Sequence, residues 1–271
     1  MRFTAHPGAL SRLHVVMLNA DAVRRELDPF WTSLEVVEQT GSTNDDVLAA
    51  ASAGAPEGMV RVAEFQSAGR GRLSRQWEAP PRSSVMFSIL LRPRVPMSRW
   101  GWIPLLTGLA IYDVLLAAGA DVALKWPNDV QLGAERKKCG GILTQATADA
   151  VVVGIGLNAI SYDGMPEVAA AIDTEWQVER EDLLRGVLTS LASRYVAWDR
   201  NDGSMSDVLD AYRAACGTIG QRVKVTLPGV AEPVIGTAHD VDADGRLIVQ
   251  RESGEELIVG AGDVVHVRPV R

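Results

Sequence analysis

The groups best suited to chemistry lie in a polar loop with the sequence AGRGRLSRQW. The loop contains three arginines, Arg70, Arg72 and Arg75. Guanidinium groups are planar donors that bind the oxygens of phosphates or carboxylates in pairs. Gly69 and Gly71 let the backbone approach a ligand closely, because they carry no side chain. The loop therefore predicts an anion-binding site, and the alternative is an exposed, solvated basic loop. RNA binding would require several aromatic stacking partners, and only Trp77 lies near.

A second set of chemical groups lies in the segment KWPNDVQLGAERKKCGGI. The residue before a proline is extended, so the Asn128 and Asp129 pair that follows Pro127 can make a tight turn and direct an amide and a carboxylate into a cleft. Lys138 precedes a run of small residues, Cys139, Gly140 and Gly141, which leave space beside its ammonium group. The segment predicts a polar site, and the alternative is an ordinary hairpin with surface lysines.

A third segment, GIGLNA, brings Asn158 to the end of a strand. Its glycine pair is too short for a dinucleotide-binding fingerprint, and no helix pattern follows directly. The sequence also lacks the GxxxxGK[ST] pattern of a P-loop. The histidines all lie outside the three segments, at His6, His14, His239 and His266. Histidine-based catalysis and histidine metal sites are therefore not expected.

The hydrophobic pattern predicts the elements that position these groups. The arginine loop lies between two predicted strands, 60–66 and 85–93. A helix follows the segment GSTN, with Ser42 or Thr43 as its cap and Gly54 at its end. Three β-rich segments separated by short turns predict an antiparallel meander over 122–132, 137–147 and 150–160. A further strand is predicted over 34–40, and helices over 22–27, 102–118, 181–198 and 207–216.

Composition and charge limit the class of protein. The chain has 271 residues, and 27 Lys and Arg against 34 Asp and Glu give a net charge of −7, which disfavours binding to duplex nucleic acid. Cys139 and Cys216 form no CxxC pattern, so we expect no disulfide framework and a reducing cytoplasm. No apolar stretch reaches the roughly 20 residues of a membrane span, so we expect no membrane association.

The predicted fold class is α+β, with a mixed sheet and helices over 30–219. Residues 1–29 are expected to form a tail and a short helix. After Gly217 short alternating strands with turns at 228–229, 244–245 and 253–254 predict a small β-barrel over 220–271.

Taken together, the segments STN, EFQSAGRGRLSRQW, KWPNDV, KKCGGIL and GIGLNA resemble the biotin protein ligase family, in this order and with family-like spacing. They run from Ser42 to Asn158. The resemblance implies a class II synthetase-like catalytic domain and an SH3-like C-terminal barrel. It also implies a two-step reaction: biotin and MgATP give biotinyl-5′-adenylate and pyrophosphate, and a lysine of a biotin carboxyl carrier protein or domain then attacks the adenylate.

The resemblance implies roles for individual residues. Lys138 and Arg72 would be catalytic. Biotin would be bound by Ser42, Thr43, Asn44, Gln66, Gly69, Arg70, Gly71, Arg72 and Lys138. ATP or the adenylate would be bound by Arg70, Arg72, Arg75, Trp77, Lys125, Asn128, Asp129 and Asn158. Magnesium would lie near Asn128 and Asn158. One position departs from the family pattern: Ser74 stands where a glycine is usual, and serine would strain the loop if that residue needs a positive φ.

Two other functions stay open at this stage. A lipoate ligase or octanoyl transferase of the same fold would activate a different acyl acid, although the arginine loop with Trp77 and the KWPND segment favour a biotin ligase. A biotin-sensing DNA-binding regulator is disfavoured, because the roughly 30 residues before the catalytic domain are too few for a winged helix. We expect neither a nucleic-acid partner nor a membrane partner. A homodimer is one of the oligomeric states that the sequence allows.

Overall fold

The computed structural model describes residues 16–174, 179–204, 206–227, 230, 232–260 and 263–266. The expected N-terminal tail and the turn at 228–229 lie outside them, apart from Val16. The larger sheet has seven strands in the order β1-β2-β3-β7-β6-β5-β4. Only β1 and β2 pair in parallel, and the other neighbours are antiparallel, which confirms a mixed sheet and the predicted meander. The bounds are β1 Ser33–Val37, β2 Met59–Ala63, β3 Ser84–Leu91, β4 Val122–Lys125, β5 Asp129–Leu132, β6 Lys137–Ala146 and β7 Val151–Asn158.

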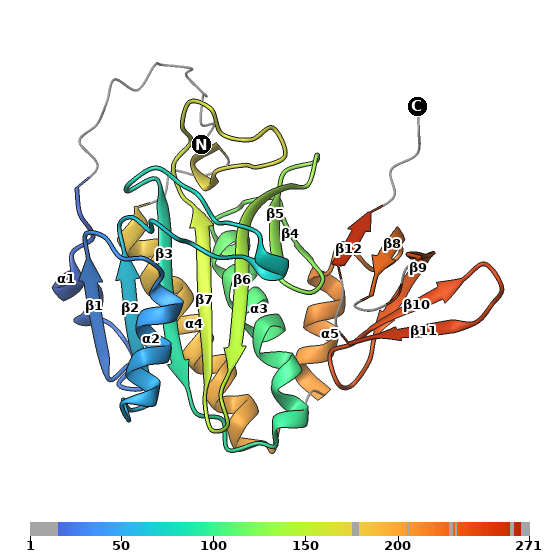
Figure 1. Ribbon diagram of the computed structural model, residues 1–271, viewed down its shortest axis with the longest axis horizontal. Helices are drawn as coiled ribbons and strands as arrows, with labels where there is room; N and C mark the ends of the chain where they lie inside the picture. Colours follow the sequence, from blue (N-terminus) through green and yellow to red (C-terminus); the bar gives the residue numbers. More distant parts are fainter. Residues whose placement is uncertain are drawn as a thin grey trace.

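Helices cover both faces of this sheet, so that it forms the middle layer of three (Figure 1). Helix α2 lies on one face, and α3 and α4 pack together on the other. The helices are α1 Ala20–Arg24, α2 Thr43–Ser52, α3 Ile103–Ala117, α4 Arg180–Arg200 and α5 Ser206–Ala215. Short 3₁₀ turns are η1 Arg72–Ser74, η2 Met97–Trp102 and η3 Ile172–Thr174. The predicted helices are all present, and Asn19 caps α1 by accepting from the Ala22 N–H, but α1 ends at Arg24 and not at residue 27.

The alternation of side chains along β3 explains why this strand is buried throughout. Val85, Phe87 and Ile89 belong to the main core with α3 and α4, whereas Leu90 packs in a small separate cluster under α2. Successive side chains of a strand point to opposite faces. The face of β3 toward α2 therefore also carries Ser88, a buried polar residue that belongs to the site described below.

The most apolar helical segment is a core element. Met97–Ala117, comprising η2 and α3, is by length and composition apolar enough to cross a membrane, which the sequence analysis did not expect. In the structure Ile103, Leu106 and Leu109 of this segment are each 1% exposed and pack in the main core. Packing between the sheet, α4 and α5 accounts for its composition.

The C-terminal part forms a five-stranded antiparallel sheet in the order β11-β10-β9-β8-β12. Its strands are β8 Arg222–Thr226, β9 Val234–Val241, β10 Leu247–Arg251, β11 Glu256–Val259 and β12 Asp263–His266. The predicted β-rich module is present. The predicted barrel closure is not seen, because the outer strands β11 and β12 do not pair within the described residues. This sheet lies beyond the β4 edge of the larger sheet (Figure 1).

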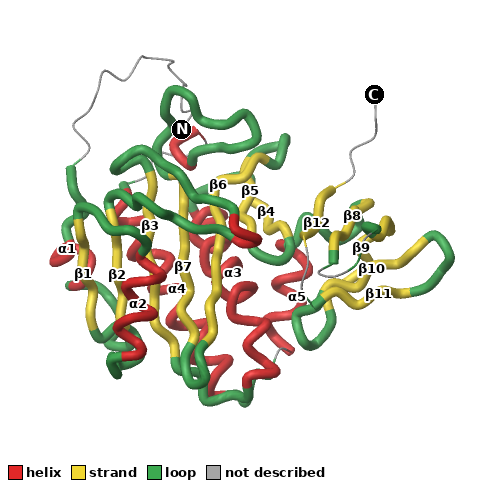
Figure 2. Tube along the Cα trace, viewed as in Figure 1, coloured by secondary structure: helices red, strands yellow, loops and turns green. Residues whose placement is uncertain are grey.

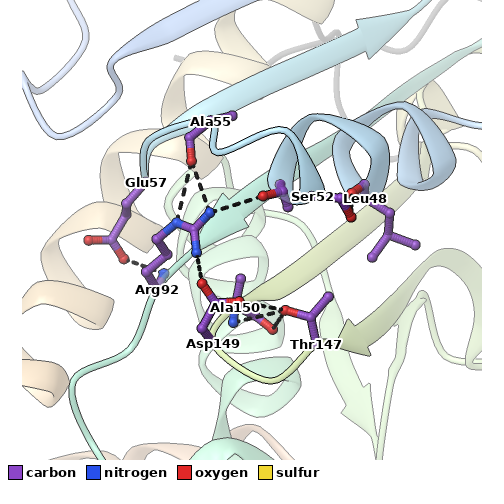
Figure 3. Close-up of polar contacts among 9 residues, drawn as sticks. Leu48, Ser52, Ala55, Glu57, Arg92, Thr147, Asp149 and Ala150 are labelled. Carbon is purple, nitrogen blue, oxygen red and sulfur yellow. Dashed lines mark hydrogen bonds and ion pairs between the residues drawn. The ribbon is translucent and has the colours of Figure 1, made fainter.

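Arg92 fixes helix α2 at its C-terminal end (Figure 3). It follows β3 and donates to the carbonyl oxygens of Ala51 and Ala55, at 3.3 and 3.1 Å from Nη2. It also pairs with Asp149 in the β6–β7 turn, and its backbone N–H donates to Glu57 Oε1 at 2.7 Å. A cation at the negative end of a helix dipole is stabilising. The N-terminal end of α2 is Thr43, which belongs to the functional site described below. Arg92 therefore holds in place a helix that reaches this site.

Candidate functional site

A cavity lies between the larger sheet and the loop 64–83, and residues of α2, this loop, β5, β6 and β7 line it. Figure 2 shows this loop, with its short helical turn, passing over β7 and β6. Most of the site residues predicted from the sequence line the cavity: Ser42, Thr43, Asn44, Gln66, Arg70, Gly71, Arg72, Arg75, Trp77, Lys125, Asn128, Asp129 and Lys138. Two predicted residues, Gly69 and Asn158, do not line it. The cavity therefore collects polar groups from segments that are far apart in the sequence.

One end of the cavity is a hydrogen-bonded polar network at the start of α2. The N–H of Thr43 donates to Gln66 Oε1 at 2.8 Å, and its hydroxyl lies 3.0 Å from the same oxygen. Ser88 Oγ lies 2.7 Å from Thr43 Oγ1 and donates to Asn44 Oδ1 at 2.6 Å. Asn44 Nδ2 donates to Gln145 Oε1 at 2.7 Å. Because these buried groups hold one another, they form a pre-ordered surface of donors and acceptors. Ser42 caps α2 through its backbone, and its side chain makes no capping hydrogen bond.

The arginine loop lies across the cavity, and its cations have partners. Arg70 forms a 2.6 Å ion pair with Asp45 in the first turn of α2. Arg72 Nη1 donates to Asn128 Oδ1 at 3.3 Å. A Cβ on Gly69 would lie 2.4 Å from the carbonyl oxygen of Trp77, so this glycine permits a close backbone approach within the loop. The positive φ of the loop falls on Leu73, at 55°, which is one residue before Ser74.

Trp77 closes the loop onto the sheet. Its indole lies against two glycines, Gly141 and Gly156. A Cβ added to Gly141 would lie 3.2 Å from the ring, and one added to Gly156 would lie 2.6 Å from it. A third glycine, Gly154, leaves room for Asn44, whose Oδ1 would lie 2.1 Å from a Cβ at that position. The sequence analysis noted Gly141 only as a small residue beside Lys138, and it missed Gly154 and Gly156 as site residues. The signal that could have found them is the alternation of glycines along the segment GIG and their pairing between β6 and β7. Small residues on one face of a sheet let another group pack closely against the backbone.

Lys138 faces the cavity because β6 contains an irregularity. Val130 pairs with Gly140 and Gln131 with Lys138, so Cys139 is an extra residue opposite β5. A β-bulge shifts the alternation of side chains. Lys138 can therefore lie on the same side as Gly141, and a Cβ there would be 3.2 Å from its Nζ.

The ammonium of Lys138 donates to Asp129 Oδ1 at 2.6 Å and lies 5.8 Å from the Trp77 ring centroid. Lys137 instead pairs with Glu135 at 3.0 Å and does not line the cavity. Of the two neighbouring lysines, Lys138 is therefore the one beside the predicted anion-binding groups. Burial raises the pKa of the adjacent Cys139 thiol well above its ordinary value, so this thiol stays protonated and acts as a packing group.

The turn between β4 and β5 forms the wall between Arg72 and Lys138. It contains the cis Trp126–Pro127 peptide and ends at Asn128. Asn128 Nδ2 donates to the Ile142 carbonyl at 3.0 Å, and the Ile142 N–H donates to the Asn128 carbonyl at 2.9 Å. These bonds hold the turn against β6, as the predicted tight turn required.

Asn128 and Asn158, the residues predicted to lie near magnesium, both make hydrogen bonds within the protein. Asn158 ends β7, but its Nδ2 donates to the Ala170 carbonyl at 3.2 Å, and Asn158 lies outside the cavity lining. The Asn128 carboxamide is engaged by Arg72 and Ile142. In the part of the chain that is described, no three His, Cys, Asp or Glu side chains gather as metal ligands. The placing of Asn128 and Asn158 near magnesium stays a prediction.

Comparisons with known sequences agree with this geometry. A profile described as the biotin/lipoate A/B protein ligase family matches residues 36–158, and a biotin protein ligase C-terminal domain profile matches residues 218–267. The chain is 40% identical over 248 residues to the biotin–[acetyl-CoA-carboxylase] ligase of Mycobacterium tuberculosis, covering 88% of this chain and 90% of that protein. It is 30% identical over 244 residues to the ligase of the same name from Paracoccus denitrificans, covering 83% and 98%.

A solved structure shares the fold. The biotin protein ligase from Aquifex aeolicus in complex with biotin and ATP matches with a TM-score of 0.74 at 24% sequence identity, covering 87% of this chain and 99% of that one. At this identity the likeness concerns the fold alone.

Proposed function

The chain belongs to the biotin protein ligase family and is an ATP-dependent biotin ligase, and from this premise we propose how its cavity performs the reaction. The observation that carries the proposal is one cavity in which the Thr43–Gln66 network lies at one end and Lys138 and Arg72 at the other. One end suits a neutral polar ring and the other suits anions. Biotin and ATP together present these two kinds of group.

We propose that the polar network binds the ureido ring of biotin. A cyclic urea has one carbonyl acceptor and two N–H donors, and it requires a matching set of fixed donors and acceptors. Thr43, Asn44 and Gln66 supply such a set, ordered by Ser88 and by Gln145. Trp77, stacked on Gly141 and Gly156, supplies an apolar wall for the aliphatic part of the molecule. Because these side chains are already held by hydrogen bonds in the absence of ligand, they lose little conformational entropy when the ligand binds.

We propose that the cationic end promotes attack of the biotin carboxylate on the α-phosphorus of ATP. The new bond joins a carboxylate oxygen to phosphorus, and pyrophosphate leaves with the electron pair of the broken P–O bond. Two anions approach each other in this step, so fixed positive charge at Lys138 and Arg72 lowers the barrier. Asp129 and Asn128 orient those two cations. Arg70, Arg75 and Lys125 also line the cavity and add to its positive field.

In the second step a lysine amine of the carrier attacks the acyl carbonyl of the adenylate. An amide forms, AMP leaves, and the amine loses a proton. The arginine loop protects the mixed anhydride from water until the carrier binds, because it already lies across the cavity through Trp77 and the Arg72–Asn128 contact.

Magnesium enters with the nucleotide in this proposal. Mg²⁺ is commonly held by substrate phosphates with few protein ligands, and the described residues offer no acidic cluster. MgATP is therefore the substrate, and we assign no described residue as a resident metal ligand.

The partner and the cellular setting are also proposals. The carrier is a biotin carboxyl carrier protein or domain of a carboxylase, on the basis of the relatives' names. Residues 30–219 and 220–271 are proposed as the catalytic and C-terminal domains. A cytoplasmic location is supported by two free, buried cysteines, Cys139 and Cys216. The net charge of −7 supports the absence of a nucleic-acid partner. Homodimer formation stays open.

Pyrophosphate release tests the proposed first step. The protein with MgATP should release pyrophosphate when biotin is added, and not when lipoate or octanoate is added. The opposite preference would favour the lipoate-type reaction of the same fold.

A further inference from the structure

Trp126 connects the cavity to the C-terminal sheet. Its side chain lines the cavity and the residue is only 2% exposed. The indole N–H donates to the carbonyl oxygen of Gly245, in the turn between β9 and β10, at 3.0 Å. Its backbone N–H donates to Thr218 Oγ1, also at 3.0 Å. Thus both the ring and the backbone of one cavity residue are held by groups that follow α5 in the chain.

The residues directly after Trp126 hold the two cations of the site. Asn128 accepts a hydrogen bond from Arg72, and Asp129 accepts one from Lys138. Lys125 pairs with Asp129 across the base of the turn, which makes the turn short. Because the turn is short and closed at its base, a displacement of Trp126 moves Asn128 and Asp129 with it.

We propose that Trp126 is a positioning residue, through which the C-terminal sheet sets Asn128 and Asp129 and thereby aims Arg72 and Lys138. The C-terminal sheet then takes part in adenylation without contacting the reacting atoms. This inference rests on the ligase reaction proposed above, because the groups that it positions act in that reaction.

The magnitude follows from the sensitivity of catalysis to placement. A shift of about 1 Å in a catalytic group costs up to about 100-fold in rate. Removing one of the two hydrogen bonds on Trp126 leaves the other in place, so a smaller shift is expected. Biotin affinity depends mainly on the Thr43–Gln66 network at the other end of the cavity, and it should change little.

Trp102 provides a matched control. It is fully buried, and its indole N–H donates to the carbonyl of Ala243, in the same β9–β10 turn, at 2.8 Å. Unlike Trp126, it does not line the cavity. Trp102→Phe and Trp126→Phe therefore each remove one indole hydrogen bond between the larger part of the protein and the same turn. Only the second change touches the 125–129 hairpin.

The experiment compares the wild type, Trp126→Phe and Trp102→Phe by biotin-dependent pyrophosphate release at saturating MgATP, with thermal melts of each. Trp126→Phe should lower kcat about tenfold and leave the KM for biotin within about twofold. Trp102→Phe should keep both constants within about twofold, because a hydrogen bond away from the cavity bears on stability and not on rate. Trp126→Phe combined with Lys138→Ala should cost less than the product of the separate effects, because both changes act on the same cation.

A second pair of variants serves if Trp126→Phe does not fold. Thr218→Val removes the hydroxyl that accepts from the Trp126 backbone N–H and contacts His266 Nε2, whereas Thr218→Ser keeps a hydroxyl for both contacts. A kcat loss in the valine variant that the serine variant rescues supports the proposal. Equal kcat values for Trp126→Phe and Trp102→Phe, or a loss confined to the KM for biotin, would overturn it. If neither the wild type nor Trp102→Phe releases pyrophosphate when biotin is added, the proposed function itself is refuted.

Discussion

Lys138→Ala should lower the rate of pyrophosphate release by about 100-fold, as removal of one preorganised transition-state donor does in other enzymes. The ammonium lies 2.6 Å from Asp129 and beside the Trp77 ring, at the end of the cavity that we assign to the anionic groups. During adenylation, negative charge builds on the α-phosphate as the biotin carboxylate approaches. A fixed cation between them is therefore worth more in the transition state than in the ground state.

The structure also sets the size of this effect. Two unit charges about 4 Å apart interact by about 4 kcal/mol at an effective dielectric constant of about 20. The Lys138 side chain is 38% exposed, so solvent screens part of that interaction. The remainder agrees with a loss of about 3 kcal/mol, or about 100-fold in rate. The loss has a second source, since the substitution leaves the Asp129 carboxylate unpaired beside an incoming anion.

Lys137→Ala is the matched control for this prediction. Lys137 forms an exposed ion pair with Glu135, and such pairs contribute about 0–1 kcal/mol, so the rate should stay within about threefold. Single-turnover release of pyrophosphate from labelled ATP, at saturating biotin, measures both variants. If Lys137 proves essential and Lys138 dispensable, the assignment of side chains to the two faces of β6 is wrong, and our account of the cationic end fails.

Three further predictions concern other parts of the structure. Arg72→Gly should release the adenylate into solution, because the loop loses a guanidinium that binds an anion. Biotin labelling of lysines on a bystander protein should therefore rise. If the variant retains the adenylate as long as the wild type does, the prediction is wrong. Arg92→Ala should lower the free energy of unfolding by about 1–3 kcal/mol, since it removes the side-chain donor to the Ala55 carbonyl and one of the donors to the Ala51 carbonyl, which also accepts from the Gly54 N–H. An unchanged urea midpoint would count against the anchor. Cys139 should resist iodoacetamide in the native protein at pH 8 and react after denaturation, because burial raises the pKa of its thiol; rapid native labelling would refute its burial.

Local sequence patterns were sufficient to predict the elements that carry the site. The helix after GSTN, the strands on either side of the arginine loop and the antiparallel meander all follow from short-range periodicity and turn residues. The polar residues of STN and KWPND therefore line one cavity, as expected. Whether they play the roles that the family resemblance implies stays a prediction.

Long-range packing determined what the sequence did not reveal. The partner of Arg70 is Asp45, which lies 25 residues earlier in the chain, before strand β2. The floor under Trp77 consists of Gly141 and Gly156, which meet only when β6 pairs with β7. The amide of Asn158 donates to the carbonyl of Ala170 in the following loop, a contact that the sequence did not predict. Each of these contacts joins segments that are distant in the chain, and local sequence patterns do not predict which distant segments meet.

Transfer of biotin to a carrier tests the central claim most directly. The protein would be incubated with MgATP, biotin and a biotin carboxyl carrier domain, and the carrier examined by intact and peptide mass spectrometry. Our account predicts a gain of one biotinyl group on a single lysine, dependent on ATP and abolished by omission of the protein. A carrier that stays unmodified with biotin, while lipoate or octanoate is attached to an acceptor domain under the same conditions, would contradict it.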